Sequence, residues 1–223
     1  MIDGAVFSPV LAKQIEKAGI VAVVSLDRQE DAVPLARALL AGGVSVMELT
    51  LRTTPALEAL KAIRSEVPEM AVGAGTVLRV DQVDAVKAAG AFFGVAPGTN
   101  VRVLRAAQDA GLPFAPGMLT PSDVELAVEE GCRLMKFFPS EPSGGVEYLR
   151  SMAAPFLHLG VKFIPLGGIH QGNLPGYLEE CCVAAVGGSW LAPKKLVAAG
   201  EWGSITAMAK EATEIISRSR RKK

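Results

Sequence analysis

The chain has 223 residues, half of them hydrophobic, which is long enough to bury one large core and suits a single domain. Its 23 basic residues balance its 23 acidic residues, so no whole-chain charge favours nucleic acid or an anionic membrane surface as a partner. No apolar run approaches the roughly 18 to 20 residues that span a bilayer, and we expect no signal peptide.

A repeating unit of one strand and one helix runs along the chain. Helix-like segments end at a glycine, as at Gly43, Gly90 and Gly131, and an apolar run follows each of them. Glycine is favoured just past a helix C-terminus, and the β-branched or aromatic runs are typical of strands. The expected strands are, in chain order, 20–26, 44–50, 70–74, 92–96, 113–116, 133–138, 162–165 and 183–186. Amphipathic helices are expected between them, for instance at 30–41 and 55–66, and an extra helix at 8–18 precedes the first strand.

Eight alternating units with mostly apolar strands predict a parallel sheet covered by helices. At this length, closure into one (β/α)8 barrel, a TIM barrel of the α/β class spanning 1–223, fits better than an open sheet. We expect the basic tail at 218–223 to be disordered and solvated rather than an arm for nucleic acid. In such barrels the active site lies at the C-terminal ends of the strands, so polar residues there are the candidate site residues.

Charged side chains fall on two of the expected strands. Alternation places Glu48 and Arg52 on one face of the second strand, and Lys136 interrupts an apolar run on the sixth. A buried amine kept neutral by desolvation and a nearby arginine can attack a ketone and form an iminium, with Glu48 moving the protons. The alternative is an interior ion pair of Lys136 with Glu48. Buried ion pairs contribute little stability and titratable groups with shifted pKa cluster at functional sites, so we favour catalysis.

Glycine pairs at two strand ends are suited to an anion. Gly167 and Gly168 follow the seventh strand, and the pair at 187–188, with Ser189 after it, follows the eighth. Backbone N–H groups without a neighbouring Cβ can approach a phosphate, although each pair alone is also compatible with a tight turn. Thr76, after the third strand, is a candidate for contacting a carboxylate. For the loop that contains Pro97, turn geometry is the simpler explanation.

Cysteines and histidines do not indicate a metal site or a disulfide. The three cysteines form neither a disulfide framework nor a CxxC pattern, which predicts a reducing, cytoplasmic location. His158 and His170 lack a second ligand at metal spacing, and Ser189 lacks His and Asp partners for a hydrolase triad. We therefore expect neither a metal nor a cofactor.

Several motifs in this order resemble one enzyme family. They are Glu-Leu-Thr-Leu-Arg-Thr from Glu48, Val-Gly-Ala-Gly-Thr-Val from Val72, Ala-Pro-Gly from Ala96, Met-Lys-Phe-Phe-Pro from Met135 and Gly-Gly-Ser-Trp at 187–190. From about residue 19 to 212 the chain resembles the 2-keto-3-deoxy-6-phosphogluconate (KDPG) aldolases, which include the bifunctional 4-hydroxy-2-oxoglutarate (KHG) aldolases.

The resemblance implies a class I aldolase that splits its substrate into pyruvate and glyceraldehyde 3-phosphate without a metal. It implies Lys136 as the Schiff-base lysine and Glu48 as the general acid/base. The other implied roles are carboxylate binding by Arg52 and Thr76, packing against the substrate by Phe138 and Pro97, and phosphate binding by Gly167, Gly168 and Ser189. A homotrimer is also implied, with small 2-keto acids as the only other partners.

Three positions depart from the pattern of the family, and they leave the substrate open. Leu166 stands where many members carry threonine, Ala96 where some carry serine, and Ser140 where alanine is frequent. An apolar residue in place of a hydroxyl weakens discrimination at the far end of the substrate. The alternatives are a related aldolase for the phosphorylated galactonate derivative, a sugar-phosphate epimerase or isomerase without a covalent lysine, and a barrel that only senses a sugar phosphate.

Overall fold

The computed structural model describes residues 7 and 9–220. Strands and helices alternate along the chain. The strands are β1 (Ile20–Val24), β2 (Val46–Thr50), β3 (Ala71–Gly75), β4 (Gly94–Val95), β5 (Phe114–Ala115), β6 (Gly117–Met118), β7 (Leu134–Phe137), β8 (Lys162–Pro165) and β9 (Val186–Gly188). The helices are α1 (Pro9–Ala18), α2 (Ala32–Ala41), α3 (Ala56–Glu66), α4 (Val80–Ala88), α5 (Val101–Asp109), α6 (Pro121–Glu129), α7 (Gly145–Ala153), α8 (Leu174–Leu178), α9 (Lys194–Ala198) and α10 (Trp202–Arg220), with 3-10 turns at Gln29–Asp31, Glu141–Ser143 and Ala154–Leu159.

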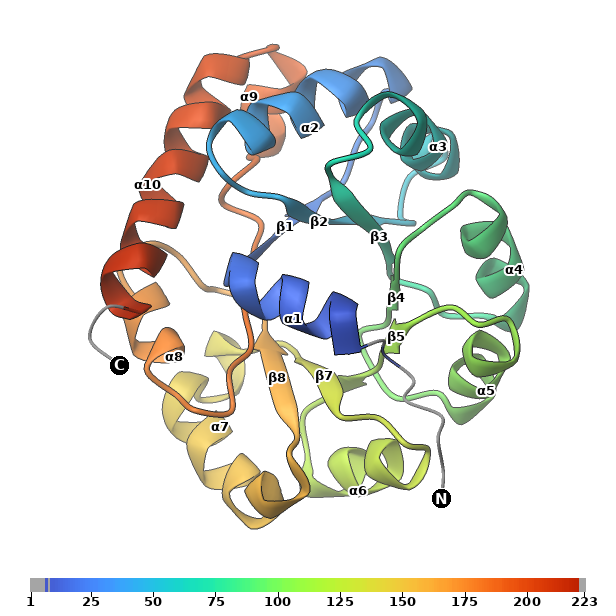
Figure 1. The fold of residues 1–223 in the computed structure, drawn as a ribbon, viewed down its shortest axis with the longest axis vertical. Coiled ribbons are helices and arrows are strands. Elements are labelled where there is room, and N and C mark those ends of the chain that lie inside the picture. Colours follow the sequence, from blue (N-terminus) through green and yellow to red (C-terminus); the bar gives the residue numbers. More distant parts are fainter. Residues whose placement is uncertain (1–6, 8, 221–223) are drawn as a thin grey trace.

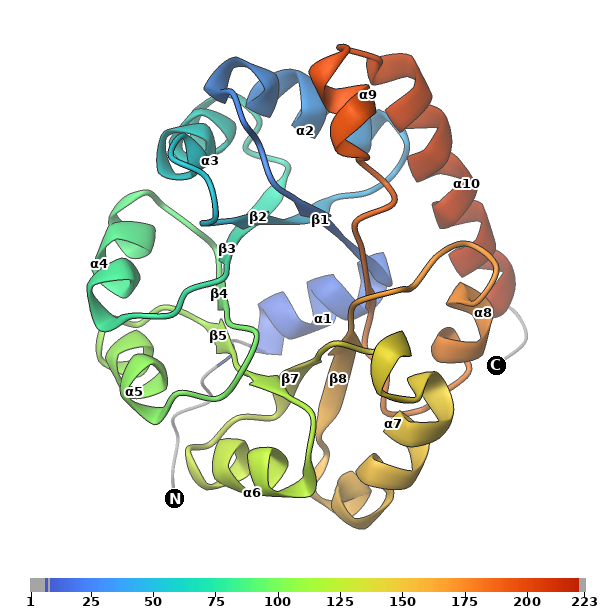
Figure 2. The same cartoon turned by 180° about the vertical axis from the view of Figure 1, so that it is seen from behind.

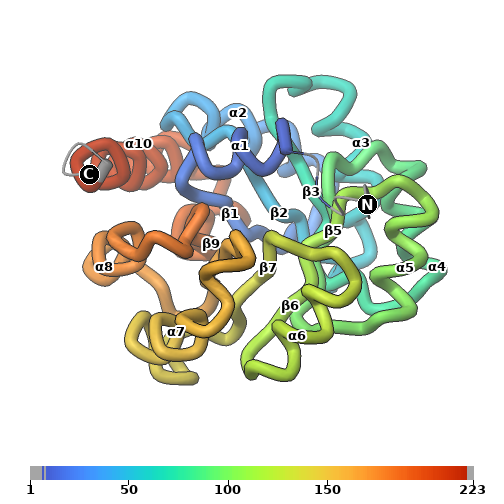
Figure 3. Tube along the Cα trace, turned by 60° about the horizontal axis from the view of Figure 1, so that its bottom comes forward, coloured from blue at the N-terminus to red at the C-terminus, as the bar shows by residue number. Residues whose placement is uncertain are grey.

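The strands form two parallel sheets that curl around a common centre. The first has the order β5-β4-β3-β2-β1-β9 and the second the order β6-β7-β8. Pro116 separates β5 from β6, and its carbonyl still accepts a 2.8 Å hydrogen bond from the backbone N–H of Lys136. On the other side Phe163 of β8 forms a parallel bridge with Val183, shortly before β9. Figures 1 and 2 show the strands around a central space, with α1 across the middle of the view and the other helices outside the strands. Figure 3 shows α4 and α5 on one side of the strands and α8 and α10 on the other.

The glycines that mark the repeating unit adopt the conformation that the sequence predicts. Gly43, Gly90, Gly111 and Gly131 have φ angles of 88°, 82°, 63° and 83°. An L side chain is disfavoured at such angles, so glycine ends each helix and turns the chain into the next strand. The alternation of helix and strand is thus confirmed at the level of the backbone.

One end of the central space is closed by α1. Figure 1 shows α1 crossing this end, where the strands begin. Leu11 and Ile15 of α1, together with Phe7, pack into a buried apolar cluster with inward side chains of the strands such as Val46 and Phe93. The ring of Phe93 occupies the place that a side chain at residue 73 would take, 2.3 Å from a Cβ built there. We call this cluster the floor. The remaining internal cavity is about 10 Å³, about enough for one water molecule.

The bounds of some elements differ from those expected. β4 covers only two of the five residues expected at 92–96, although the backbone N–H groups of Phe92 and Ala96 still donate to Val72 and Ala115 of the neighbouring strands. The last strand begins at Val186 instead of residue 183, because the segment before it is buried and pairs irregularly with Phe163. The expected disorder at 218–223 is wrong for 218–220, which continue α10. Arg218 there donates to the Glu214 carbonyl at 3.3 Å. Residues 221–223, and Ser8 of the first helix, lie outside the described residues.

Within the described residues, no helix combines the length and the apolar character needed to cross a bilayer.

Candidate active site

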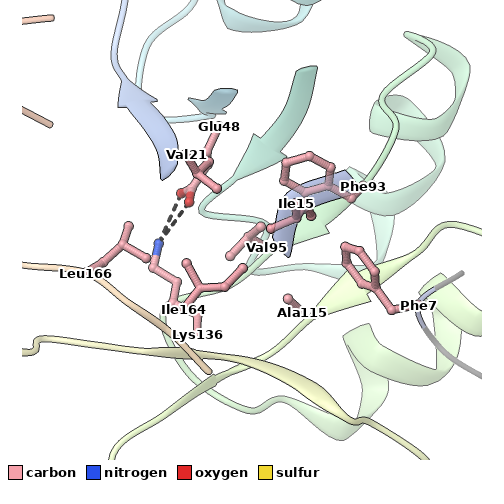
Figure 4. A pocket seen from close by; sticks show the side chains of 10 residues that line it. All are labelled: Phe7, Ile15, Val21, Glu48, Phe93, Val95, Ala115, Lys136, Ile164 and Leu166. Atoms are coloured by element: carbon pink, nitrogen blue, oxygen red, sulfur yellow. Dashed lines mark hydrogen bonds and ion pairs between the residues drawn. The ribbon is translucent and has the colours of Figure 1, made fainter. Parts of the chain in front are cut away.

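A buried ion pair lies above the floor, on the side where the strands end. The Lys136 Nζ atom donates to both Glu48 carboxylate oxygens, at 3.0 Å to Oε1 and 3.3 Å to Oε2. Glu48 is 2% exposed and Lys136 6% exposed. Figure 4 shows the two groups pointing at each other, with Leu166 beside the amine and the floor residues behind. Glu48 of β2 and Lys136 of β7 therefore meet at one site, as predicted. They also form the interior ion pair that the sequence analysis gave as the alternative to catalysis.

Gly75 makes room for the Glu48 carboxylate. Glu48 lies opposite residue 73 in the β2–β3 register, and Gly75 lies opposite Thr50. A Cβ on Gly75 would lie 2.0 Å from Glu48 Oε1, so any side chain there would displace the carboxylate from Lys136. The glycine-bearing end of this strand is visible in the sequence, but this role of Gly75 depends on the neighbouring strand and has no signal there.

Phe138 forms one wall of the site. Its ring centroid lies 5.3 Å from Lys136 Nζ, which is within the range of a cation–π contact, and the residue is 37% exposed. Pro97 is half-buried one strand further away. Its carbonyl carbon would be 2.1 Å from a Cβ on Gly117, the residue opposite Lys136 in the β6–β7 register. The structure therefore brings Phe138 to the lysine, and it places Pro97 against the neighbouring strand.

Arg52 is held by two hydroxyl groups. Its Nη2 donates to Ser25 Oγ at 2.8 Å, and its Nε donates to Thr50 Oγ1 at 3.3 Å. The two hydroxyls lie 2.6 Å from each other. Arg52 forms no ion pair within 7 and 9–220. Its charge is therefore available to an anion. The contacts of Arg52 with Ser25 and Thr50 were not predicted from the sequence.

Thr76 occupies a strained backbone position. With a φ angle of 61° it is the one non-glycine residue at positive φ in the described part of the chain. Such a conformation costs a β-branched residue about 1 to 3 kcal/mol, and strain of this kind clusters at functional sites. Thr76 directly follows Gly75 and is half-buried at the end of β3.

The two glycine pairs differ in their exposure and in the side chains packed against them. Gly167 and Gly168 lie past the end of β8 with φ angles of 100° and 78°, and Gly168 is exposed. The pair at 187–188 lies within β9, and packing explains its lack of side chains. A Cβ on residue 187 would lie 2.1 Å from Leu166, and one on residue 188 would lie 2.4 Å from the Trp190 ring. Ser189 is exposed directly after β9. Packing constrains the first pair as well, because a Cβ on Gly168 would lie 2.6 Å from the Glu141 Cβ. Gly168 and Ser189 are the exposed residues at this edge, and Gly167 is half-buried.

The thiol of Cys132 and the imidazole of His170 are the other reactive groups considered. Burial raises the pKa of the Cys132 thiol to about 12, which makes it a poor nucleophile. The Nδ1 atom of His170 accepts a 3.1 Å hydrogen bond from the Gly172 backbone N–H. In the part of the chain that the structure describes, no three His, Cys, Asp or Glu side chains gather as a metal site would require.

A buried lysine paired with a glutamate, together with an arginine that forms no ion pair among the described residues, fits the resemblance found in the motifs. The family described as KDPG and KHG aldolase matches residues 11–208. This chain belongs to that family.

Relatives and solved structures of this family are similar over most of the chain. The 2-dehydro-3-deoxy-phosphogluconate aldolase of Treponema pallidum is 44% identical over 202 residues, 91% of this chain and 95% of that protein. The KHG/KDPG aldolase of Escherichia coli K12 is 45% identical over 195 residues, 87% of this chain and 91% of that protein. The structure of a KDPG aldolase from Legionella pneumophila, with pyruvate captured at low pH as a covalent carbinolamine intermediate, has a TM-score of 0.86 and 37% identity, and covers 90% of this chain and 97% of that one.

Proposed function

We propose that this aldolase cleaves KDPG to pyruvate and glyceraldehyde 3-phosphate through a Schiff base on Lys136. The observation that carries the proposal is the buried hydrogen bond between Lys136 and Glu48, because it joins an amine nucleophile to a group that can take its proton. The captured carbinolamine of the Legionella pneumophila relative supports covalent chemistry with pyruvate in this family.

Glu48 carries the protons in each step of the proposed mechanism. It takes a proton from Lys136, and the neutral amine attacks the C2 ketone. After a proton moves from the nitrogen to the oxygen, Glu48 returns its proton to the carbinolamine hydroxyl, which leaves as water and gives the iminium. Glu48 then removes the C4 hydroxyl proton, the C3–C4 bond breaks, and its electrons enter the iminium to form an enamine. Glu48 protonates C3 of the enamine, and water hydrolyses the pyruvate iminium from Lys136.

Arg52 and Thr76 would bind the substrate carboxylate, and Phe138 would pack beside the imine, with Pro97 further along the same wall. The charge of Arg52 is held by neutral hydroxyls, which favours an anionic partner. Because α1 fills the other end of the central space, the substrate would enter from the side where the strands end.

Gly167, Gly168 and Ser189 would bind the phosphate. Gly168 and Ser189 are exposed at the ends of neighbouring strands, and glycine allows backbone N–H groups to approach an anion. Leu166, directly before the pair, presents an apolar side chain beside the lysine, so a second substrate, KHG, cleaved to pyruvate and glyoxylate, is compatible with the site. The name of the Escherichia coli relative includes both substrates.

We further infer that the two sheets are parts of one closed (β/α)8 barrel in a single domain. Two connections support closure: the hydrogen bond from Lys136 to Pro116 between β5 and β6, and the hydrogen bond from Ala184 to the Phe163 carbonyl at 3.0 Å. A homotrimer and a cytoplasmic location stay predictions. Sedimentation velocity at micromolar concentrations would test the trimer.

Reductive trapping tests the proposed chemistry. The protein is incubated with pyruvate and sodium borohydride, and intact mass and peptide mapping are compared for the wild type and Lys136→Ala. We expect a reduced pyruvate adduct on Lys136 that is absent from the variant. A folded wild-type protein without an adduct would contradict the lysine mechanism and favour an epimerase or a sugar-phosphate sensor. Assays with KDPG, its galactonate isomer and KHG would then rank the substrates.

A further inference from the structure

Ser25 directly follows β1 and reaches the site from a strand that supplies none of the residues assigned above. Val23 lies opposite Glu48 in the β1–β2 register, so two residues further Ser25 comes beside Thr50. The 2.6 Å contact between their hydroxyl oxygens agrees with this register. Ser25 and Thr50 thus lie one layer above Glu48, towards the open end of the strands.

The two hydroxyls fix one edge of the Arg52 guanidinium. A guanidinium has five N–H donors in a rigid plane, and two of them are used on Thr50 and Ser25, so three remain for a ligand. Each hydroxyl carries one hydrogen, and only one of the two is needed for the contact between them. The other hydrogen has no acceptor among the described residues and is also available to a ligand.

The acidic residues of the loop after β1 are paired with other cations. Asp27 forms an ion pair with Lys194 at 3.2 Å, and Arg28 pairs with Asp31 at 2.6 Å and with Glu30 at 3.8 Å. None of these carboxylates forms an ion pair with Arg52, so none of them balances its charge. The arginine is therefore oriented by neutral acceptors, which hold its position without reducing its charge.

We propose that Ser25 is a positioning residue that orients Arg52 toward the carboxylate of the bound 2-keto acid. This inference rests on the proposed function of the site. A carboxylate held by Arg52 in turn places C2 of the substrate near Lys136. Ser25 acts through Arg52, and its effect is confined to anionic ligands.

The test measures half-saturating concentrations for borohydride trapping, with pyruvate and with its uncharged methyl ester as probes. In Ser25→Ala we expect the value for pyruvate to rise about 5- to 20-fold, while the value for the ester stays within about twofold. The rise is smaller than the roughly 10- to 150-fold of a direct hydrogen bond to a charged group, because Ser25 acts through Arg52 and Thr50 still contacts the guanidinium. Ser25→Thr keeps the hydroxyl and should restore most of the affinity for pyruvate. Ser25→Asp would place an anion against Arg52 and should raise the value for pyruvate by about 100-fold or more.

Ser65→Ala is the matched control, because Ser65 is an exposed serine on α3 at the outer surface. Circular dichroism and the melting temperature verify that each variant is folded. If Ser25→Ala shifts pyruvate and its ester equally, or shifts neither, the positioning role is wrong. These outcomes differ from a failure of the proposed function, in which the wild-type protein itself would form no adduct. If Ser25→Ala is unstable, the comparison of Ser25→Thr with Ser25→Asp gives the same test.

Discussion

The central space has two layers with opposite physical chemistry, although the same strands build both. In β2 the side chain of Val46 belongs to the apolar floor, and two residues later Glu48 is paired with Lys136. The floor is stabilised by the removal of apolar surface from water, about 25 cal/mol per Å². The charged layer must instead compensate the desolvation of two ions, and a buried ion pair of this kind adds little net stability. The comparison indicates that stability comes from the floor and reactivity from the layer above it.

Replacement of the lysine should give the largest effect on activity. In Lys136→Met we expect kcat/KM for KDPG to fall by at least about 10⁴-fold, because the proposed nucleophile is lost while the volume is kept. A coupled assay of pyruvate release measures this. Loss of the partner leaves the Glu48 charge buried, so the variant should also be less stable by about 3 to 5 kcal/mol. The double variant Lys136→Met with Glu48→Gln should recover most of that stability and none of the activity. If the double variant has the same melting temperature as Lys136→Met, the unpaired charge of Glu48 is not what destabilises the single variant.

A change in the floor should affect stability far more than catalysis. Phe93→Ala removes the ring that packs where residue 73 lacks a side chain, and such substitutions cost about 3 to 5 kcal/mol. We expect the free energy of unfolding in urea to fall by that amount, with kcat at 25 °C within about threefold of the wild type. A large fall in kcat in folded protein would show that the floor also positions the lysine.

Substitution of Gly75 should move the glutamate while leaving all charges in place. A methyl group there would collide with the Glu48 carboxylate, which lies 2.0 Å from the Cβ position. In Gly75→Ala we expect kcat to fall by about 10²-fold, the usual effect of displacing a catalytic group by about 1 Å. Single-turnover measurement of imine formation verifies that the chemical step is slowed. Gly98→Ala is a control on a neighbouring loop, because a Cβ there would meet nothing within 4 Å.

Relief of the strain at Thr76 should give the smallest effect. Thr76→Gly fits the φ angle of 61° without steric conflict, which stabilises the folded state. Glycine also increases the conformational entropy of the unfolded chain, which offsets part of this gain. We expect a net rise in the free energy of unfolding of about 1 kcal/mol or less. The KM for KDPG should rise several-fold because the hydroxyl is lost. Thr76→Ser, which keeps the hydroxyl, should retain the KM. A fall in stability in Thr76→Gly would mean that packing of the threonine side chain outweighs the strain.

Local patterns in the sequence were sufficient for the repeating unit and for most of the candidate site. Glycine past each helix and alternation within each strand depend on residues a few positions apart, so they predicted the α/β repeat and placed Glu48 and Arg52 on one face of β2. Lys136 was conspicuous because an ammonium in an apolar strand requires an explanation. These inferences need no knowledge of how distant segments pack.

The tertiary structure alone decided what depends on register and on packing between strands. The pairing of Ser25 with Thr50 follows from the alignment of β1 against β2, which alternation within one strand does not set. The need for Gly75 arises from the carboxylate of a neighbouring strand, and the glycines of β9 are explained by Leu166 and Trp190. The use of α1 as a floor depends on the inward side chains of strands from both sheets, because one amphipathic helix can cover many apolar surfaces. A residue that orients a charged group, such as Ser25, is recognised only when its partner is in place, because its role depends on a contact between two strands.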